Sequence, residues 1–296
     1  MIVVTAPTAK IGRHVVEQLL DAGEPVRVVV RDPRRLSPTV RDRVEIVEGS
    51  HRDAAVVDKA FAGADAVFWL MPSDLRAPDV MTAYVEASRP GVEAVTAHGV
   101  RHVVGVSALG RGTAVAGRAG NVTASLAMDD LFAEVTNYRS LANPTFMDNT
   151  LRDIRTILGE GVISGPFAPD RKLPLVATRD IGTVAAGLLL DRTWAGFADV
   201  PVLGPEDLSG NDMAAVITDA VGIPVRYVQV EAASLETAML SFGASPGMAR
   251  AMADMARAKV DGLDEGVLRI AENSTPTTFR QWCTEALRPA VDTARS

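Results

Sequence analysis

Short hydrophobic runs alternate with segments of helical periodicity along the first half of the chain. Near-continuous apolar runs, such as residues 103–106, are typical of strands buried on both faces. Strands are expected at 2–5, 26–30, 44–47, 66–70, 102–107 and 138–141, and helices at 11–22, 83–97 and 122–135. This alternation predicts βαβ units, and therefore an α/β protein with a Rossmann-type, doubly wound parallel sheet.

The second half of the chain is less regular. A Gly- and Pro-rich stretch at 159–174 indicates an excursion, and Ser209 is suited to begin a helix. Helices are expected at 180–190, 208–221 and 235–259, the last interrupted near 243–246, and a strand at 225–230. We expect a Rossmann dinucleotide-binding domain over 1–150 with 176–203 returning to it, a smaller α/β substrate-binding region over 151–175 and 204–290, and a frayed tail at 291–296.

Composition narrows the class of protein. Of 296 residues, 47% are hydrophobic and 23% charged, so a sizeable core can be buried. The formal net charge of -7, without a dense Lys/Arg run, argues against nucleic acid or an anionic membrane as a partner. Cys283 is the single cysteine, which fits a reducing compartment, and no secretory signal pattern is visible. These features predict a cytoplasmic monomer or homodimer that acts on a small molecule.

The first expected strand runs directly into a tight loop and a helix. The amides that begin such a helix, together with its dipole, suit the pyrophosphate of a dinucleotide. Of the three usual glycines only Gly12, which lets helix and strand pack closely, remains, since Ala6 and Ala9 take the other positions. The methyl group of Ala9 would push a phosphate outward, whereas Lys10 could supply a counter-charge. The predicted cofactor contacts here are Thr5, Ala6, Thr8, Ala9, Lys10, Ile11 and Gly12. The alternative is an ordinary strand–helix turn without a ligand.

Arginines follow the second expected strand. Arg31 ends it, and Arg34 and Arg35 come soon after. NAD-preferring folds place an acid at this point for the ribose hydroxyls, whereas NADP-preferring folds place an arginine for the 2′-phosphate. Guanidinium groups bind phosphate in bidentate geometry. Arg31 and Arg35 are therefore predicted to bind NADP(H), and the alternative is a solvated charged turn.

Read in order, these landmarks resemble the NmrA-like family of atypical short-chain dehydrogenases over nearly the whole chain. The resembling segments are residues 5–12, 31–33, 49–50, 102–109, 146–149, 180–181, 204–209, 222–225 and 275–279. The resemblance implies NADPH binding, with either reduction of a quinone, ketone or enone or a redox-sensing regulatory role. Ser50 replaces the acid that this family usually places near the adenine edge. Ser50 and Met71 complete the predicted cofactor contacts.

Reduction of a carbonyl needs a proton donor as well as a hydride donor. Typical short-chain dehydrogenases use a Ser together with a Tyr and a Lys four residues apart on the helix after the fifth strand. The helix expected over 122–135 contains no Tyr, Lys or His, so this relay is absent. Asp129 and Asp130 on it are interpreted as solvated surface acids. The scattered histidines show no metal-ligand spacing, so no metal is expected.

Six residues are predicted to face the substrate. Ser107, at the usual serine position, Asn149 and Arg118 are the candidate catalytic residues. Trp69, Phe146 and Met252 are the candidate substrate-binding residues. Two arguments support the second group: ligands bind at the carboxyl ends of parallel strands, and methionine packs well against flat aromatic surfaces.

These predictions lead to an NADPH-dependent reductase of a ketone, enone or quinone-like aromatic small molecule. The proton would come from water or from the substrate's own hydroxyl. The first alternative is an enzyme that has left redox chemistry, such as an isomerase, cyclase or dehydratase, because loop and relay are both altered. The second is a regulator that senses the dinucleotide and binds a protein partner.

Overall fold

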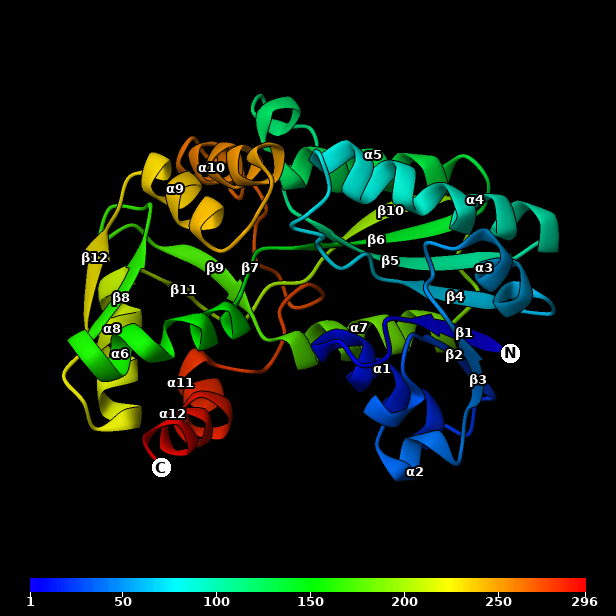
Figure 1. Ribbon diagram of the computed structural model, residues 1–296, viewed down its shortest axis with the longest axis horizontal. Coiled ribbons are helices and arrows are strands. Elements are labelled where there is room, and N and C mark those ends of the chain that lie inside the picture. Colours follow the sequence, from blue (N-terminus) through cyan, green and yellow to red (C-terminus); the bar gives the residue numbers. More distant parts are fainter.

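The computed structural model describes residues 1–296 and contains a central sheet of seven strands (Figure 1). The strands are β1 (Ile2–Thr5), β2 (Val26–Val30), β3 (Glu45–Glu48), β4 (Ala66–Trp69), β5 (His102–Ala108), β6 (Asn137–Asn143) and β10 (Phe197–Pro201). Their order is β10-β6-β5-β4-β1-β2-β3, and every neighbouring pair is parallel. The order reverses between β1 and β4, which creates the switch point where ligands bind in such sheets. The predicted α/β, Rossmann-type class is confirmed.

Helices cover both faces of the sheet (Figure 1). On one face lie α1 (Lys10–Asp21) and α7 (Thr178–Leu190), and on the other lie α3 (Ala54–Phe61), α4 (Ala87–His98) and α5 (Asn121–Ala133). The shorter elements are α2 (Pro38–Arg41), 3-10 turns at Pro33–Arg35, Ala116–Arg118 and Met147–Asp153, and a wide helical turn at Thr82–Glu86. The four helices expected along the sheet are therefore present, with ends displaced by a few residues.

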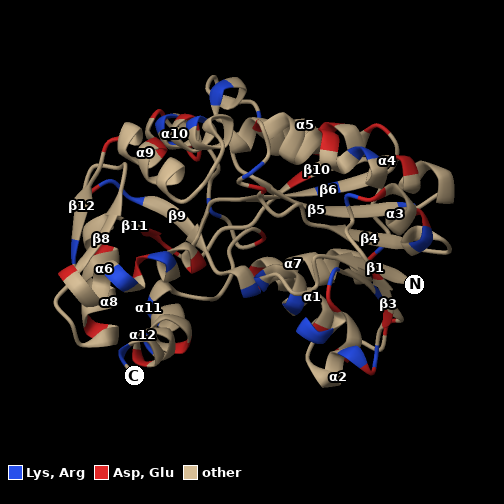
Figure 2. Cartoon of the chain, viewed as in Figure 1, with Lys and Arg blue, Asp and Glu red and all other residues tan.

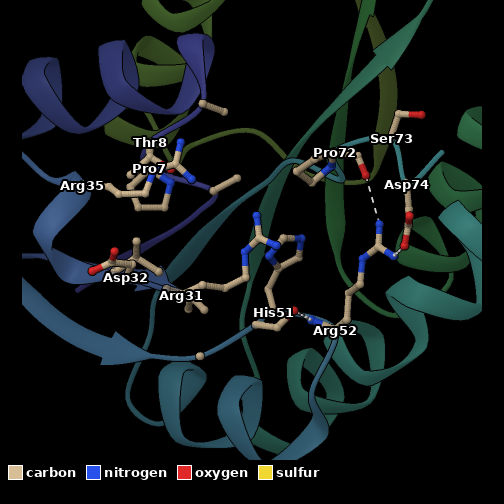
Figure 3. Close-up of a pocket in the computed structure, with 16 residues that line it drawn as sticks. Pro7, Thr8, Arg31, Asp32, Arg35, His51, Arg52, Pro72, Ser73 and Asp74 are labelled. Carbon is tan, nitrogen blue, oxygen red and sulfur yellow. Dashed lines mark hydrogen bonds and ion pairs between the residues drawn. The ribbon is translucent and has the colours of Figure 1, made fainter. Parts of the chain in front are cut away.

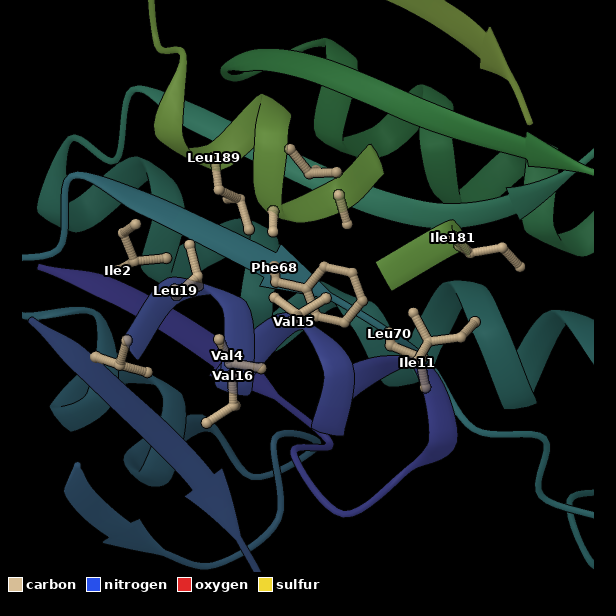
Figure 4. Packing of buried hydrophobic residues seen from close by; sticks show 14 of the residues in the cluster. Ile2, Val4, Ile11, Val15, Val16, Leu19, Phe68, Leu70, Ile181 and Leu189 are labelled. Atoms are coloured by element: carbon tan, nitrogen blue, oxygen red, sulfur yellow. The ribbon is translucent and has the colours of Figure 1, made fainter. Parts of the chain in front are cut away.

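Two buried clusters hold the helices on the sheet. The larger has 22 residues and joins β1, β2 and β4 to α1 and α7 (Figure 4). Val4, Leu19 and Phe68 are wholly buried in it. The second has 17 residues on the other face, among them Trp69 and Phe132. Removal of these side chains from water is the main favourable term in folding. The carboxyl edge of the sheet is therefore held by close-packed side chains on both faces.

A smaller region packs beside the sheet. It contains β7 (Thr145–Phe146), β9 (Leu173–Val176) and β11 (Asp207–Leu208) in one sheet, β8 (Val162–Gly165) and β12 (Arg226–Gln229) in another, and α6 (Ile154–Glu160), α8 (Gly210–Val221), α11 (Phe279–Trp282) and α12 (Arg288–Arg295), with a wide helical turn at Cys283–Leu287. A cluster of 14 buried residues forms its core. Ser209 caps α8 through a reciprocal bond pair with Asp212, as its position predicts.

The Gly- and Pro-rich stretch at 159–174 contains β8, which pairs in parallel with β12 and belongs to the smaller region. One expectation for this region is wrong: the last residues are not a frayed tail, because residues 288–295 form α12. Val291 is wholly buried in the core of the smaller region, and the Arg295 guanidinium donates to Val221 O at 3.4 Å. These contacts attach α12 to its neighbours.

A helical hairpin connects the two regions. It consists of α9 (Ala232–Ser241) and α10 (Pro246–Val260), and corresponds to the interrupted helix expected at 235–259. The beginning of α10 docks on the segment that follows β4. There the Ser245 amide donates to Leu75 O at 2.8 Å, and the Ser245 hydroxyl donates to Ala77 O at 2.5 Å. The hairpin is thereby fixed to the wall of the cavity described below.

Acidic and basic residues are interspersed along most elements (Figure 2). None of the helices combines the length and the apolar character needed to cross a bilayer. No group of three or more His, Cys, Asp and Glu side chains is arranged to hold a metal ion.

Candidate cofactor and active site

The loop between β1 and α1 keeps the backbone shape of a glycine loop although its first position is alanine. Ala6 has a φ of 49° and is the only non-glycine residue with a positive φ. Its carbonyl accepts the Ala9 amide at 3.0 Å, which closes the turn. An L-residue in this left-handed region costs about 1–2 kcal/mol. Strain of this kind is concentrated at functional sites.

The first amides of α1 are left open by this loop. The first helical hydrogen bond runs from Arg13 N to Ala9 O at 2.9 Å. The amides of Lys10, Ile11 and Gly12 therefore have no acceptor within the helix. The N-cap provides no side-chain bond, and the first turn contains no acid. Open amides at the positive end of a helix dipole form an anion-binding site.

Gly12 allows the loop to lie directly on the helix. A Cβ atom at this position would lie far inside contact distance of the Ala6 carbonyl oxygen. This oxygen cannot retreat, because it belongs to the strained loop backbone and accepts the Ala9 amide. Glycine is therefore required here, as the sequence indicated.

A cavity of about 420 Å³ extends from this loop across the carboxyl edge of the sheet (Figure 3). Four segments line it: residues 6–9, residues 29–32 with Arg35, residues 49–52 and residues 72–74. They follow β1, β2, β3 and β4 respectively. The cavity thus lies at the switch point of the sheet, where the topology places ligands.

Arginines line the side of the cavity nearest β2. Arg31 and Arg35 both reach it. Arg34 does not, because it is exposed and its Nε atom pairs with Asp32 at 2.9 Å. The cavity therefore combines two guanidinium groups near β2 with the open amides near α1, which is a suitable arrangement for a ligand with separated phosphate groups.

The segment after β3 contributes a residue that sequence reasoning missed. His51 is buried, lies edge-on to Trp69 with ring centroids 5.3 Å apart, and has no partner for its Nε2 atom. Burial, with the nearby charges of Arg52 and Arg31, lowers the pKa of His51 to about 4, so it is neutral at physiological pH. Ser50 lines the cavity beside it.

The far wall of the cavity is tied to the segment after β4. The Arg52 guanidinium pairs with Asp74 at 2.9 Å and donates to Pro72 O at 3.0 Å. Gly49 has a φ of 147°, and a Cβ atom there would collide with the Val56 side chain. The backbone at Gly49 therefore packs closer to α3 than another residue would permit.

Several residues predicted to contact the cofactor or substrate do not line this cavity. The Thr5 hydroxyl donates to Phe68 O and accepts the Leu70 amide, both at 3.0 Å, and so joins β1 to β4. Met71 is buried in the second core cluster. Ile11 is buried in the larger cluster and offers only its amide.

The prediction for Trp69 is also wrong. Its side chain is wholly buried on the face of the sheet that α3, α4 and α5 cover, and its indole N–H donates to Ser88 Oγ at 3.3 Å. It packs so closely against Gly91 of α4 that a Cβ there would overlap the ring. A strand end places alternate side chains on opposite faces, and Trp69 faces the core.

Lys10 links the loop to the smaller region instead of pointing into the cavity. Its ammonium group pairs with Asp148 at 3.1 Å, and Asp148 also accepts the Thr178 amide at 3.2 Å. Because Lys10 is 45% exposed, this pair contributes little to stability. Its role as a counter-charge for phosphate stays a prediction.

Asp129 is not a solvated surface acid, contrary to the sequence interpretation. Its carboxylate is wholly buried and accepts the hydroxyls of Ser107 at 2.5 Å, Tyr138 at 2.7 Å and Ser140 at 2.8 Å. Burial raises the pKa of Asp129 to about 6, although the three hydroxyls and Arg111 favour the ionised form. Asp130, the next residue, is exposed and pairs with Arg111 at 2.7 Å.

Neither Ser107 nor Arg118 lines the cavity at the switch point. Arg118 is 65% exposed, pairs with Asp261 at 3.1 Å and lines a separate cavity of about 570 Å³ beside α10. The two cavities share no lining residue. Asn149, Phe146 and Met252 are half-buried, and their substrate contacts stay predictions.

The parallel sheet, the open helix terminus and the arginine-lined cavity define a dinucleotide-binding Rossmann protein. Two family models match the chain: one described as NAD(P)H-binding over residues 8–151, and one of the NmrA-like family over residues 132–281. The chain belongs to the NmrA-like family, and the predicted resemblance is confirmed.

Curated relatives and solved structures agree with this assignment. The chain is 30% identical to (4-alkanoyl-5-oxo-2,5-dihydrofuran-3-yl)methyl phosphate reductase of Streptomyces griseus, over 96% of this chain and 97% of that protein. It is 28% identical to NAD(P)H azoreductase of Xenophilus azovorans, over 86% of each. The Escherichia coli NADPH-dependent quinone oxidoreductase in complex with NADPH has a TM-score of 0.76, 20% identity and full coverage of both chains. The prediction of an NAD(P)H-dependent oxidoreductase is confirmed at the level of class.

Proposed function

We propose that this protein is an NADPH-dependent reductase that acts on a ketone, enone or quinone-like group of an aromatic small molecule. The observation that carries this proposal is the open set of amides at Lys10, Ile11 and Gly12, which the strained Ala6 conformation maintains. A turn without a ligand has no reason to hold an alanine at positive φ, because relaxation would recover about 1–2 kcal/mol.

The residues present fit a dinucleotide. The amides of α1 would hold the pyrophosphate, and the cavity leads from them to Arg31 and Arg35. Two guanidinium groups and no unpaired acid at this point favour a 2′-phosphate, hence NADPH over NADH. The unpartnered nitrogen of His51 is a further polar group for the adenosine half. When bound, the cofactor would supply a hydride. The chain would bind the cofactor, orient it and exclude water.

The reductase chemistry is supported by the names of the relatives. A furanone phosphate, an azo compound and a quinone each contain a polarised, unsaturated group that accepts a hydride. The absence of the Tyr and Lys of typical short-chain dehydrogenases fits substrates that accept hydride readily, because less proton assistance is then required.

The test compares cofactors and two matched arginines. NADPH should raise the thermal midpoint of the wild-type protein more than NADH does at the same concentration. The variant Arg31→Ala should weaken NADPH binding by about 10- to 100-fold, because a hydrogen bond to a charged group contributes about 1.5–3 kcal/mol. It should leave NADH binding nearly unchanged. Arg34→Ala is the control, since Arg34 is exposed outside the cavity.

A panel of quinones, azo dyes and enones should then identify turnover by loss of NADPH absorbance. The alternatives give different results. A non-redox enzyme would convert its substrate without nicotinamide, and a regulator would bind NADPH without turnover. A wild-type protein that binds neither nucleotide at millimolar concentration contradicts the proposal.

A further inference from the structure

A buried acid lies beneath the carboxyl end of β5, and the proposed reaction has no assigned proton donor. Asp129 is on α5, the helix that carries the Tyr and Lys in typical short-chain dehydrogenases. Three hydroxyls donate to its carboxylate within 2.8 Å. Such a set is more than helix attachment requires, because a buried carboxylate is costly and an apolar residue would hold α5 on the sheet as well.

Only one of the three hydroxyls belongs to a residue with any exposed surface. The Tyr138 hydroxyl is enclosed against Gly105, where a Cβ atom would overlap it, and Ser140 is wholly buried in the middle of β6. Ser107 is the next-to-last residue of β5 and retains 6% exposure. Carboxyl ends of parallel strands are where ligands bind in this fold. Ser107 is therefore the link between Asp129 and the active edge of the sheet.

The opposite side of the network leads to solvent. Arg111 Nη2 lies 3.6 Å from the Asp129 carboxylate, and this guanidinium also pairs with Asp130 at 2.7 Å and Asp199 at 3.1 Å. Arg111 is 29% exposed and Asp130 is 60% exposed. Arg111 is the charged group that acts on Asp129 directly, whereas Asp130 and Asp199 act through Arg111. The network thus reaches from the protein surface to the end of β5.

We propose that Ser107 is the catalytic residue that donates a proton to the substrate, and that Asp129 is the positioning residue that orients Ser107 and restores its proton. This inference rests on the proposed reductase function. Two electrons and one hydrogen reach the substrate carbon as a hydride, and the π-electron pair of the carbonyl group moves to its oxygen. When Asp129 carries a proton, its O–H donates to Ser107 Oγ and the Ser107 O–H is free to turn to the substrate. The substrate oxygen takes the Ser107 proton, Ser107 takes the proton of the Asp129 carboxylic acid, and Asp129 recovers a proton from solvent.

The electrostatics of the network suit this role. Burial raises the pKa of the Asp129 carboxyl to about 6, so about half of the molecules carry this proton at pH 6 and about a tenth at pH 7. Burial also raises the pKa of the Tyr138 hydroxyl well above its usual range, so Tyr138 stays a neutral donor that holds the carboxyl in place. A general acid works best when its pKa lies near the working pH.

The experiment measures kcat against pH for full-length protein with NADPH and a water-soluble naphthoquinone. In the wild type kcat should fall as pH rises through about 6, because the protonated acid is the active form. Ser107→Ala should lower kcat about 100-fold with NADPH affinity unchanged. Asp129→Asn should lower kcat similarly and remove the fall with pH. Ser125→Ala, a buried serine of α5 outside the network, is the matched control.

A third variant separates a relay from a purely structural network. Tyr138→Phe removes a donor that favours the ionised carboxylate, so the fall in kcat should move to higher pH. A network that only fastens α5 would change the thermal midpoint in all three variants but leave the pH profile in place. If Ser107→Ala keeps the kcat and the pH profile of the wild type, the proton relay is overturned and the proposed reductase function is not. Failure of the wild type to bind NADPH or to reduce any acceptor contradicts the proposed function itself.

Discussion

The loop after β1 and the network beneath β5 lie at the same edge of the sheet but depend on different parts of the chain. The loop works through its backbone, and the replacement of two glycines by Ala6 and Ala9 leaves its amides open. The network works through side chains, and each of its three hydroxyl hydrogen bonds ends on one carboxylate, Asp129. A binding site made of amides can tolerate side-chain replacement, whereas proton chemistry is lost with a single residue.

The largest expected effect comes from a change in the backbone of the loop after β1. Gly12→Ala should destabilise the protein by about 3 kcal/mol and abolish NADPH binding, because overpacking against a backbone oxygen cannot be relieved by a side-chain rotation. Chemical denaturation and thermal shift would measure both changes. Gly187→Ala is the matched control: this residue lies in α7 with open space around it, so alanine should stabilise the protein slightly. Equal behaviour of the two variants would refute the close contact at Gly12.

The second effect is the pH dependence of stability from Asp129. Its pKa is raised on folding, so the folded state binds more protons than the unfolded state between pH 3.8 and about 6. Stability should therefore be highest at the lower end of this window and fall by about 3 kcal/mol as pH rises through it. Asp129→Asn should remove this component of the slope in denaturant titrations at several pH values. The contradicting result is an Asp129→Asn variant whose stability changes with pH as much as that of the wild type, because buried Asp129 would then bind no extra proton on folding.

The smallest effects distinguish the two alanines of the loop. Ala6→Gly relieves a positive φ but adds freedom to the unfolded chain, so a net gain of about 0.5 kcal/mol is expected. Ala9 has an ordinary φ of -72°, so Ala9→Gly should cost about 0.5 kcal/mol of stability.

The affinity for NADPH should not follow the change in stability. Ala9→Gly removes the methyl group nearest the phosphate and should raise NADPH affinity, whereas Ala6→Gly should change it little. Isothermal titration of both variants provides the comparison. A larger gain in affinity at residue 6 than at residue 9 would show that the pyrophosphate does not follow the expected path.

The sheet could be predicted from the sequence because its strands carry strong local signals. The apolar residues of β5 and the lone glycine at position 12 each indicate a buried strand and a close contact without reference to distant residues. The short strands β8 and β9 could not be found in this way, since glycine and proline near them weaken the strand pattern and their partners are remote in sequence.

The side chains of the site were harder to predict for the same reason. Asp129 was assigned to the surface because a lone acid on a helix is usually solvated, and its three donors come from β5 and β6. Trp69 was assigned to the pocket from its strand-end position, although the alternation of side chains turns it to the core. His51 gave no signal, because its burial depends on Trp69 and on the segment after β4.

The central claim is that a pyrophosphate binds at the first amides of α1. Backbone NMR of the labelled protein during titration with NADPH tests it most directly. We expect the amide resonances of Lys10, Ile11 and Gly12 to shift strongly and to saturate together, and NADH to produce the same pattern at higher concentration. Saturable binding that leaves these three amides unmoved would contradict it.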